Sequence, residues 1–221
     1  MKKIWVIIPA YNEGKSLQVM LEGVKRKNIP LLVIDDGSTD DTYESAAKVA
    51  DEVIRSKKNL GKGNSLKKGI EYLLNNKEFD YLVTMDADGQ HSADDLDKFI
   101  QISEKSPDIV VGNRMSNPFG MPRIRMWTNK LMSWFISFII GQKIPDTQCG
   151  FRLIKKEVLE KIRIKTKKFE TDSEILIKAA RAGFVIENLP VKSIYPLDSH
   201  SKINPFVDTI RFLRFLFWLA R

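Results

Sequence analysis

Two aspartates separated by a single residue, Asp86 and Asp88, follow an apolar run at residues 81–85. A short apolar run of this kind is typical of a buried strand, so both carboxylates are expected at its carboxyl end. Hard divalent cations prefer oxygen ligands and are often held by one or two carboxylates together with substrate phosphates. Gln90 adds a carbonyl oxygen nearby. The pattern predicts a site for Mg²⁺ or Mn²⁺ at Asp86, Asp88 and Gln90.

Local structure explains part of the same segment. Asp88 followed by glycine is a common turn pair, and Ser92 with Asp95 three residues later has the spacing of a helix cap. Neither feature explains Asp86, which ends a buried strand where an unpaired charge would be unfavourable. We therefore accept the cap and keep the metal interpretation for the aspartate pair.

A second pair, Asp35 and Asp36, ends the apolar run at residues 31–34. At a strand end these carboxylates are expected to accept hydrogen bonds from a ribose hydroxyl or a base edge. The alternative is that this stretch serves the next helix, with Ser38 or Thr39 as its N-cap.

Lys62 lies between two glycines at the start of a predicted helix. Backbone donors and a cation at a helix N-terminus favour phosphate, although this sequence is also an ordinary surface turn. The spacing of the glycines matches neither a Walker loop nor a dinucleotide-binding fingerprint.

Further along the chain, four cations occur without an intervening acidic residue: Arg114, Arg123, Arg125 and Lys130. They form either a solvated basic face or a phosphate-binding loop in which guanidinium groups make bidentate contacts. Asp172 is a further candidate carboxylate. Its neighbours Thr171 and Glu174 have capping-box spacing, which is the structural alternative for that segment.

The elements that must position these residues alternate between strands and helices. Strands are expected at 4–8, 31–34, 52–55, 81–85 and 109–111, and helices near 15–27, 40–50, 62–75, 93–104 and 172–182. This order predicts an α/β fold with a mostly parallel, Rossmann-like sheet covered by helices on both faces. Ligands of such sheets bind at the carboxyl ends of the strands, where the polar motifs fall.

The chain is expected to form one domain of residues 1–221, because no linker-like stretch divides it. Residues 1–114 would form the half with the metal motif, 115–200 a second half that completes the same cleft, and 203–221 an amphipathic C-terminal helix. That helix and the basic, apolar segment 123–140 suit a membrane interface, or else they pack on the sheet or a partner. The longest apolar run, 131–140, is too short for a transmembrane helix.

Charge and cysteine content restrict the function classes. Lys and Arg number 36 against 28 Asp and Glu, a net charge of +8 that indicates an anionic partner. The single cysteine, Cys149, excludes an internal disulfide and a zinc site with several thiolates, and it fits a reducing cytoplasm.

In this order, the motifs resemble family 2 glycosyltransferases of the GT-A fold, particularly the branch of dolichol- or polyprenyl-phosphate mannose synthases. The matching stretches are residues 8–13, 35–40, 61–63, 86–91, 112–114, 146–152 and 201–202. The mannose synthases tend to carry an Arg and a Gly shortly before the last of these stretches, and this chain lacks both, so the resemblance leaves the sugar open.

The motifs and the resemblance together predict roles for individual residues. The nucleotide sugar and the metal would be held by residues 1–114 and the acceptor by residues 115–200. Those expected to hold the nucleotide sugar are Pro9, Tyr11, Glu13, Ile34, Asp35, Asp36, Lys62, Asp86, Ala87, Asp88 and Arg114. Those expected to contact the acceptor phosphate are Arg125, Ser201 and Lys202, and the catalytic residues are expected to be Asp88, Arg114 and Asp172.

The expected reaction is an inverting, metal-dependent transfer of a hexose from a GDP- or UDP-linked donor to a polyprenyl (dolichyl or undecaprenyl) phosphate. The enzyme would lie peripherally on the cytoplasmic face of the membrane. One alternative is transfer to a saccharide or lipid hydroxyl, with Asp172 as the general base. The other is a non-enzymatic basic protein that binds membranes or nucleic acid, although no nucleic-acid-binding motif is present and nucleic acid is not expected as a partner.

Overall fold

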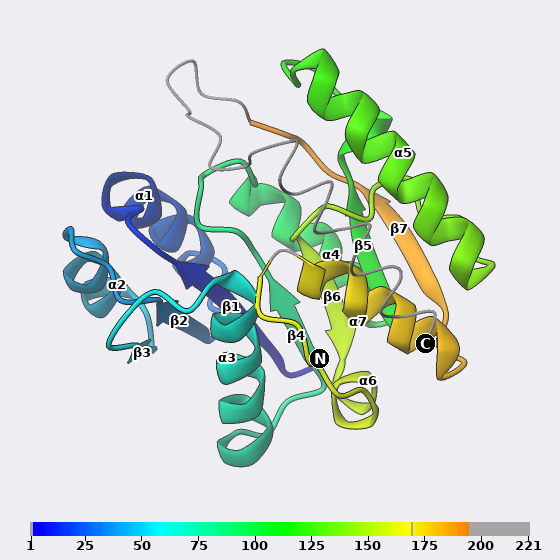
Figure 1. The fold of residues 1–221 in the computed structure, drawn as a ribbon. Helices are drawn as coiled ribbons and strands as arrows, with labels where there is room; N and C mark the ends of the chain where they lie inside the picture. Colours follow the sequence, from blue (N-terminus) through cyan, green and yellow to red (C-terminus); the bar gives the residue numbers. More distant parts are fainter. Residues whose placement is uncertain (1, 169, 195–221) are drawn as a thin grey trace.

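The computed structural model describes residues 2–168 and 170–194. A seven-stranded sheet forms its centre, in the order β3-β2-β1-β4-β6-β5-β7 (Figure 1). The strands are β1 (Ile4–Ala10), β2 (Leu31–Asp35), β3 (Glu52–Arg55), β4 (Tyr81–Thr84), β5 (Ile109–Asn113), β6 (Arg152–Lys155) and β7 (Ile186–Pro190). All neighbours pair in parallel except β6, which runs antiparallel to both β4 and β5.

Helices cover both faces of the sheet, with α3 and α7 in front of it in Figure 1 and α1 and α4 behind it. The α-helices are α1 (Gly14–Lys25), α2 (Thr42–Val49), α3 (Lys62–Asn76), α4 (Leu96–Ser103), α5 (Arg123–Ile140), α6 (Lys156–Lys161) and α7 (Glu170–Arg181). Two 3₁₀ turns, η1 (Ala93–Asp95) and η2 (Arg114–Ser116), follow the loops after β4 and β5. α5 packs against α7 at the outer side of the molecule.

The core lies on both faces of the sheet. Strand β2 is buried at every position, and Val6, Ile7 and Ile8 of β1 are fully buried. Uninterrupted apolar strands are expected where helices cover both faces of a parallel sheet. The predicted α/β fold, with a mostly parallel sheet and helices on both faces, is therefore confirmed.

Strand β6 was not predicted, because residues 146–152 have a turn-rich sequence and the strand, which begins at Arg152, is only four residues long. Its first and last residues, Arg152 and Lys155, are charged, which hides the strand pattern. The sequence therefore did not reveal the one antiparallel strand among the described residues, although the sheet is mostly parallel, as predicted.

Three cap expectations differ from the structure. Ser92 does cap η1, but Asp95 accepts a hydrogen bond from the backbone of Lys192 rather than closing a capping box. Glu174 accepts from the backbone of Lys165 and Thr166, so it caps no turn of α7. Neither Ser38 nor Thr39 is the N-cap of α2, because that helix begins at Thr42.

Across residues 2–168 and 170–194, no helix is long and apolar enough to cross a bilayer. The predicted helix at 203–221 lies outside the described residues.

Candidate active site

The loop after β4 presents Asp86 and Asp88 at the carboxyl edge of the sheet. The side chain of Asp86 is 22% exposed, and its Oδ1 lies 2.6 Å from Nζ of Lys62. Its Oδ2 lies 3.4 Å from Nε2 of His91, a buried ring that packs on Phe151. Asp88 is partly exposed, and its Oδ1 accepts a hydrogen bond from the backbone N–H of Gln90 at 3.0 Å. The two carboxylates thus have different surroundings.

Gly150 makes room for Asp86. A Cβ atom at this position would lie 2.3 Å from Oδ2 and 2.5 Å from Oδ1 of Asp86, closer than real contacts allow. Only glycine therefore fits beside this carboxylate without displacing it.

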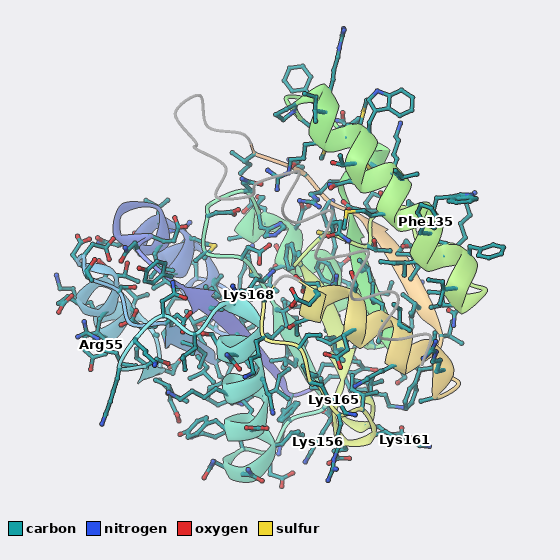
Figure 2. All side chains as sticks on the ribbon, in the orientation of Figure 1. Arg55, Phe135, Lys156, Lys161, Lys165 and Lys168 are labelled. Carbon is teal, nitrogen blue, oxygen red and sulfur yellow. The ribbon has the colours of Figure 1, made fainter. Side chains whose placement is uncertain are left out.

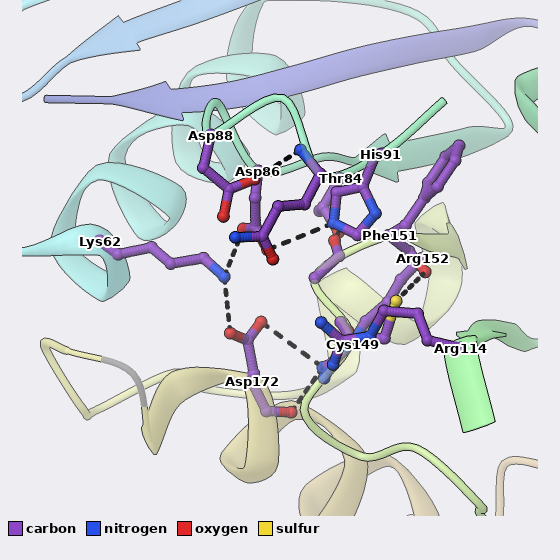
Figure 3. Close-up of polar contacts among 12 residues, drawn as sticks. Lys62, Thr84, Asp86, Asp88, His91, Arg114, Cys149, Phe151, Arg152 and Asp172 are labelled. Atoms are coloured by element: carbon purple, nitrogen blue, oxygen red, sulfur yellow. Dashed lines mark hydrogen bonds and ion pairs between the residues drawn. The ribbon is translucent and has the colours of Figure 1, made fainter. Parts of the chain in front are cut away.

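Lys62 joins the two halves of the chain (Figure 3). Its Nζ also lies 2.8 Å from Oδ2 of Asp172, in the first turn of α7. Burial would lower the pKa of Lys62, but the carboxylates of Asp172 and Asp86 raise it above its ordinary value. For Asp86, burial opposes ionisation, yet Lys62 and His91 hold its pKa well below the usual range. An ammonium between two carboxylates is therefore the charged centre of the site.

Arg152 fixes the loop before β6 against α7. Its guanidinium is 1% exposed and donates to the carbonyls of Thr147, Cys149 and Asp172, and it lies 3.7 Å from Oδ1 of Asp172. Both oxygens of Asp172 consequently face cations, Lys62 on one side and Arg152 on the other.

Asp35 and Asp36 are buried at the end of β2 and bond to neighbouring loops. Asp35 accepts from the backbone of Ser38 at 2.9 Å and pairs with Nε of Arg55 at 3.0 Å. Asp36 accepts from the backbone N–H groups that precede α3, at Leu60 and Gly61, over 2.7–3.1 Å. These carboxylates therefore order the edge of the cleft, and their contact with a nucleoside stays a prediction.

An open groove of about 440 Å³ lies beside Asp35 at the same edge. The residues that line it are Gly37, Ser38, Thr39, Arg55, Ser56 and Lys57. The loop after β1 is tied to it, because Asn12, in the left-handed region with φ of 52°, donates to Oγ of Ser38 and accepts from the backbone of Thr39. Gly37, Ser38 and Thr39 of this groove directly follow Asp36 in the chain, so the groove is a candidate site for the nucleoside.

Of the other predicted nucleotide residues, Pro9 near the end of β1 and Tyr11 and Glu13 in the loop after it are partly exposed. Ile34 is fully buried and its side chain approaches Gly69 of α3, so it can reach a ligand only through its backbone. Ala87 is also buried, between Asp86 and Asp88.

Arg114 is 2% exposed and forms a bidentate ion pair with Asp146. Nε and Nη2 donate to the two carboxylate oxygens at 2.7 and 2.9 Å, and the backbone N–H of Arg114 donates at 3.1 Å. A phosphate contact by Arg114 stays a prediction and would require this pair to open. Arg125 is partly buried on α5, and Ser201 and Lys202 lie outside the described residues.

Sequence reasoning did not single out His91, Asp146, Gly150 or Arg152. All four lie in stretches that resemble the family, at 86–91 and 146–152, which was the available signal. Their roles depend on contacts between segments far apart in the chain, and the residues themselves give no periodic pattern.

The residues present suit a metal that is shared with a ligand rather than held by protein alone. Among the described residues, no group of three or more His, Cys, Asp and Glu side chains could hold an ion. The carboxylates of Asp86 and Asp88 are the oxygen donors that Mg²⁺ or Mn²⁺ takes alongside phosphates. The Lys62 ammonium already places a cation against Asp86, which shows that this oxygen favours positive charge.

Comparison with known proteins shows the family of this chain. The sequence model of glycosyl transferase family 2 matches residues 5–163. A UDP-N-acetylglucosamine–dolichyl-phosphate N-acetylglucosaminyltransferase of Methanococcus voltae is 34% identical over 88% of this chain and 86% of its own length. A dolichyl-phosphate β-glucosyltransferase of Saccharomyces cerevisiae is 31% identical over 93% of this chain and 70% of its own.

Among solved structures, a glucosyl-3-phosphoglycerate synthase of Mycobacterium tuberculosis, in complex with Mn²⁺, UDP and glucosyl-3-phosphoglycerate, superposes with a TM-score of 0.71. The match covers 96% of this chain and 76% of the other, and at 16% identity it concerns the fold alone. The fold is of the GT-A type. From the family match and the two sequence relatives together, we conclude that this chain is a glycosyltransferase that belongs to family 2.

Proposed function

We propose that this enzyme transfers a hexose from a UDP- or GDP-linked donor to a polyprenyl phosphate, with inversion at the anomeric carbon. The observation that carries the proposal is the meeting of Asp86, Lys62 and Asp172 at one edge of the sheet. It joins the half assigned to the donor, residues 1–114, to the half assigned to the acceptor, residues 115–200. The names of the two sequence relatives share dolichyl phosphate and differ in the sugar, which supports the acceptor class more than any one sugar.

The donor would lie along the carboxyl ends of β1, β2 and β4. Asp86, Asp88 and Gln90 would hold Mg²⁺ or Mn²⁺, which supplies Lewis-acid stabilisation of the departing nucleoside diphosphate when bound. Lys62 stands at the N-terminus of α3, where the helix dipole and a cation both favour phosphate. The groove lined by Gly37, Ser38, Thr39 and Arg55 would receive the nucleoside. Pro9, Tyr11, Glu13 and Asp36 are expected to contact it.

The surroundings of Asp172 support a phosphate acceptor over a hydroxyl. A hydroxyl acceptor needs a general base within hydrogen-bond reach. Both oxygens of Asp172 face Lys62 and Arg152, so this carboxylate is engaged by cations. A phosphate monoester is already ionised at neutral pH and can attack without losing a proton to the enzyme.

Helix α5 supports a location at the membrane surface. Its exposed face carries large apolar side chains, with exposed fractions of 71% at Ile124, 67% at Trp127, 61% at Trp134 and 78% at Phe138. Side chains project from the outer side of this helix in Figure 2, where Phe135 is labelled. The helix contains two arginines and a lysine and no acidic residue. Aromatic and basic residues on one helix suit an anionic bilayer, and we place the enzyme on the cytoplasmic face.

A transfer assay tests the reaction. The protein is incubated with Mn²⁺, a panel of UDP- and GDP-sugars, and a polyprenyl phosphate in vesicles that contain phosphatidylglycerol. We expect one donor to yield a glycosylated polyprenyl phosphate. Sugar transfer to a hydroxyl acceptor, with no polyprenyl product from any donor, would refute the proposed acceptor.

Vesicle co-sedimentation tests the membrane face. The double variant Trp127→Ser, Trp134→Ser is expected to lose most binding to phosphatidylglycerol vesicles. Val19→Ser removes an equally exposed apolar residue from α1 and is expected to bind as the unaltered protein does. Equal binding by all three proteins would contradict the role of α5.

A further inference from the structure

The ammonium of Lys62 lies against the Asp86 carboxylate, to which the proposed function assigns a divalent cation. Its Nζ lies 2.6 Å from Oδ1 of Asp86 and 2.8 Å from Oδ2 of Asp172. Asp86 is one of two carboxylates assigned to the metal under the proposed function. The ammonium is therefore in direct competition with a metal ion for the same oxygen.

The ammonium of Lys62 carries a positive charge, and the carboxylates of Asp86 and Asp172 lie 2.6 and 2.8 Å from it. A metal that approached Asp86 would meet a positive charge about 3 Å away, where like charges repel strongly even in a partly solvated cleft.

Hydrogen bonds on both sides of Lys62 hold its backbone, which leaves its side chain as the part best able to respond to a ligand. The N–H of Gly61 donates to Asp36, and the N–H of Asn64 donates to the carbonyl of Lys167 at 3.1 Å. A Cβ at Gly63 would lie 2.6 Å from the carbonyl carbon of Lys167, so the chain segments are in close contact. The lysine side chain itself has a flexible four-carbon stem and three rotatable donors.

We propose that Lys62 is a tethered counterion that keeps divalent metal from Asp86 until a nucleoside diphosphate enters. The diphosphate offers the ammonium other anionic oxygens beside the start of α3, and the released Asp86 oxygen then accepts the metal. Metal and donor therefore bind together, and free metal binds weakly. This inference rests on the proposed metal site.

Mn²⁺ binding measured by electron paramagnetic resonance, without any sugar donor or turnover, tests the proposal. Lys62→Met is expected to bind Mn²⁺ about tenfold or more tightly than the unaltered protein when nucleotide is absent, because a buried repulsive charge is gone. UDP or GDP is expected to tighten Mn²⁺ binding strongly in the unaltered protein and little in the variant.

Two further variants test whether a change in Mn²⁺ binding comes from the pair between Lys62 and Asp86. Lys67→Met removes a lysine from the same helix, one paired with Glu71 at the surface, and should leave Mn²⁺ binding unchanged. Asp172→Asn leaves Lys62 on Asp86 and should bring no tighter binding. Circular dichroism and a melting curve show whether Lys62→Met folds. If it does not, Lys62→Gln serves in its place, because the uncharged glutamine amide can donate hydrogen bonds to Asp86 and Asp172.

The outcomes distinguish this proposal from the function on which it rests. Equal, nucleotide-independent Mn²⁺ binding by the unaltered protein and the Lys62 variant would overturn the counterion role and leave the metal site standing. Absence of Mn²⁺ binding in both proteins, even with UDP or GDP, would overturn the metal site and the counterion together.

Discussion

Replacement of Gly150 by alanine tests whether the position of the Asp86 carboxylate controls catalysis. The new Cβ would lie 2.3 Å from Oδ2 of Asp86, and an ordinary contact of about 3.4 Å requires the carboxylate to retreat by about 1 Å. That movement would also stretch the 2.6 Å contact with Lys62. The φ of Gly150 lies outside the left-handed region, so alanine adds no backbone strain of that kind.

A misplacement of about 1 Å in a catalytic group can lower a rate by about 100-fold, or about 3 kcal/mol in the activation barrier. We expect the Gly150→Ala enzyme to lose about that much in kcat, measured as sugar transferred to polyprenyl phosphate from the donor that the panel identifies. Its melting temperature should change by only a few degrees, about what 1 kcal/mol gives in a domain of this size.

Gly141→Ala is the matched control. Gly141 ends α5 with φ of 67°, and nothing lies within 4 Å of the added Cβ. Alanine there should lower the free energy of unfolding by about 1 kcal/mol through backbone strain and leave transfer unchanged. Full activity in Gly150→Ala, with Gly141→Ala behaving as expected, would refute the reasoning about Asp86.

Three further predictions follow from buried groups. Asp36→Ala should lower the free energy of unfolding by about 3 kcal/mol in a urea titration and weaken nucleotide binding, because two backbone N–H groups lose their acceptor. Burial raises the pKa of Cys149 to about 12, so iodoacetamide at about pH 8 should label the thiol only after unfolding; rapid labelling of the native protein would contradict its burial. Burial would raise the pKa of Glu174, but Lys178 and Thr166 lower it below the ordinary value. The ionised carboxylate therefore stabilises the fold at pH values above the ordinary pKa of glutamate, and this stabilisation is lost as the pH falls through the lowered pKa. Glu174→Gln should therefore melt lower at neutral pH and show a smaller loss of stability on acidification from about pH 5 to pH 3.

The first half of the fold could be predicted because each element there has its own signal. The apolar runs at 4–8 and 31–34 lie in β1 and β2, and the helical spacing at residues 15–27 corresponds to α1. The pattern 81–85 became β4, with Asp86 and Asp88 at the carboxyl edge as expected. These strands are buried on both faces of the sheet, and uninterrupted apolar runs are typical of such strands.

The second half could be predicted less well because its structure depends on contacts between distant segments. β6 is short and begins with Arg152, whose burial is stabilised by three carbonyls, two in the preceding loop and one in α7. Lys62 was expected to bind phosphate, and nothing in its own segment indicates that Asp86 and Asp172 would meet it. The phosphate contact of Arg114 stays a prediction, and nothing near Arg114 in the sequence indicates that its guanidinium pairs with Asp146.

The central claim is that Asp86 and Asp88 hold a divalent metal together with the diphosphate of a nucleotide sugar. Its most direct test is the thermal shift of the unaltered protein and of Asp88→Ala with UDP, GDP and their sugars, first with Mn²⁺ and then with EDTA. The claim predicts that one nucleotide family raises the melting temperature of the unaltered protein only with Mn²⁺, and that Asp88→Ala folds normally and shows no such shift. The same shift in EDTA, or in Asp88→Ala with near-normal transfer, would contradict it.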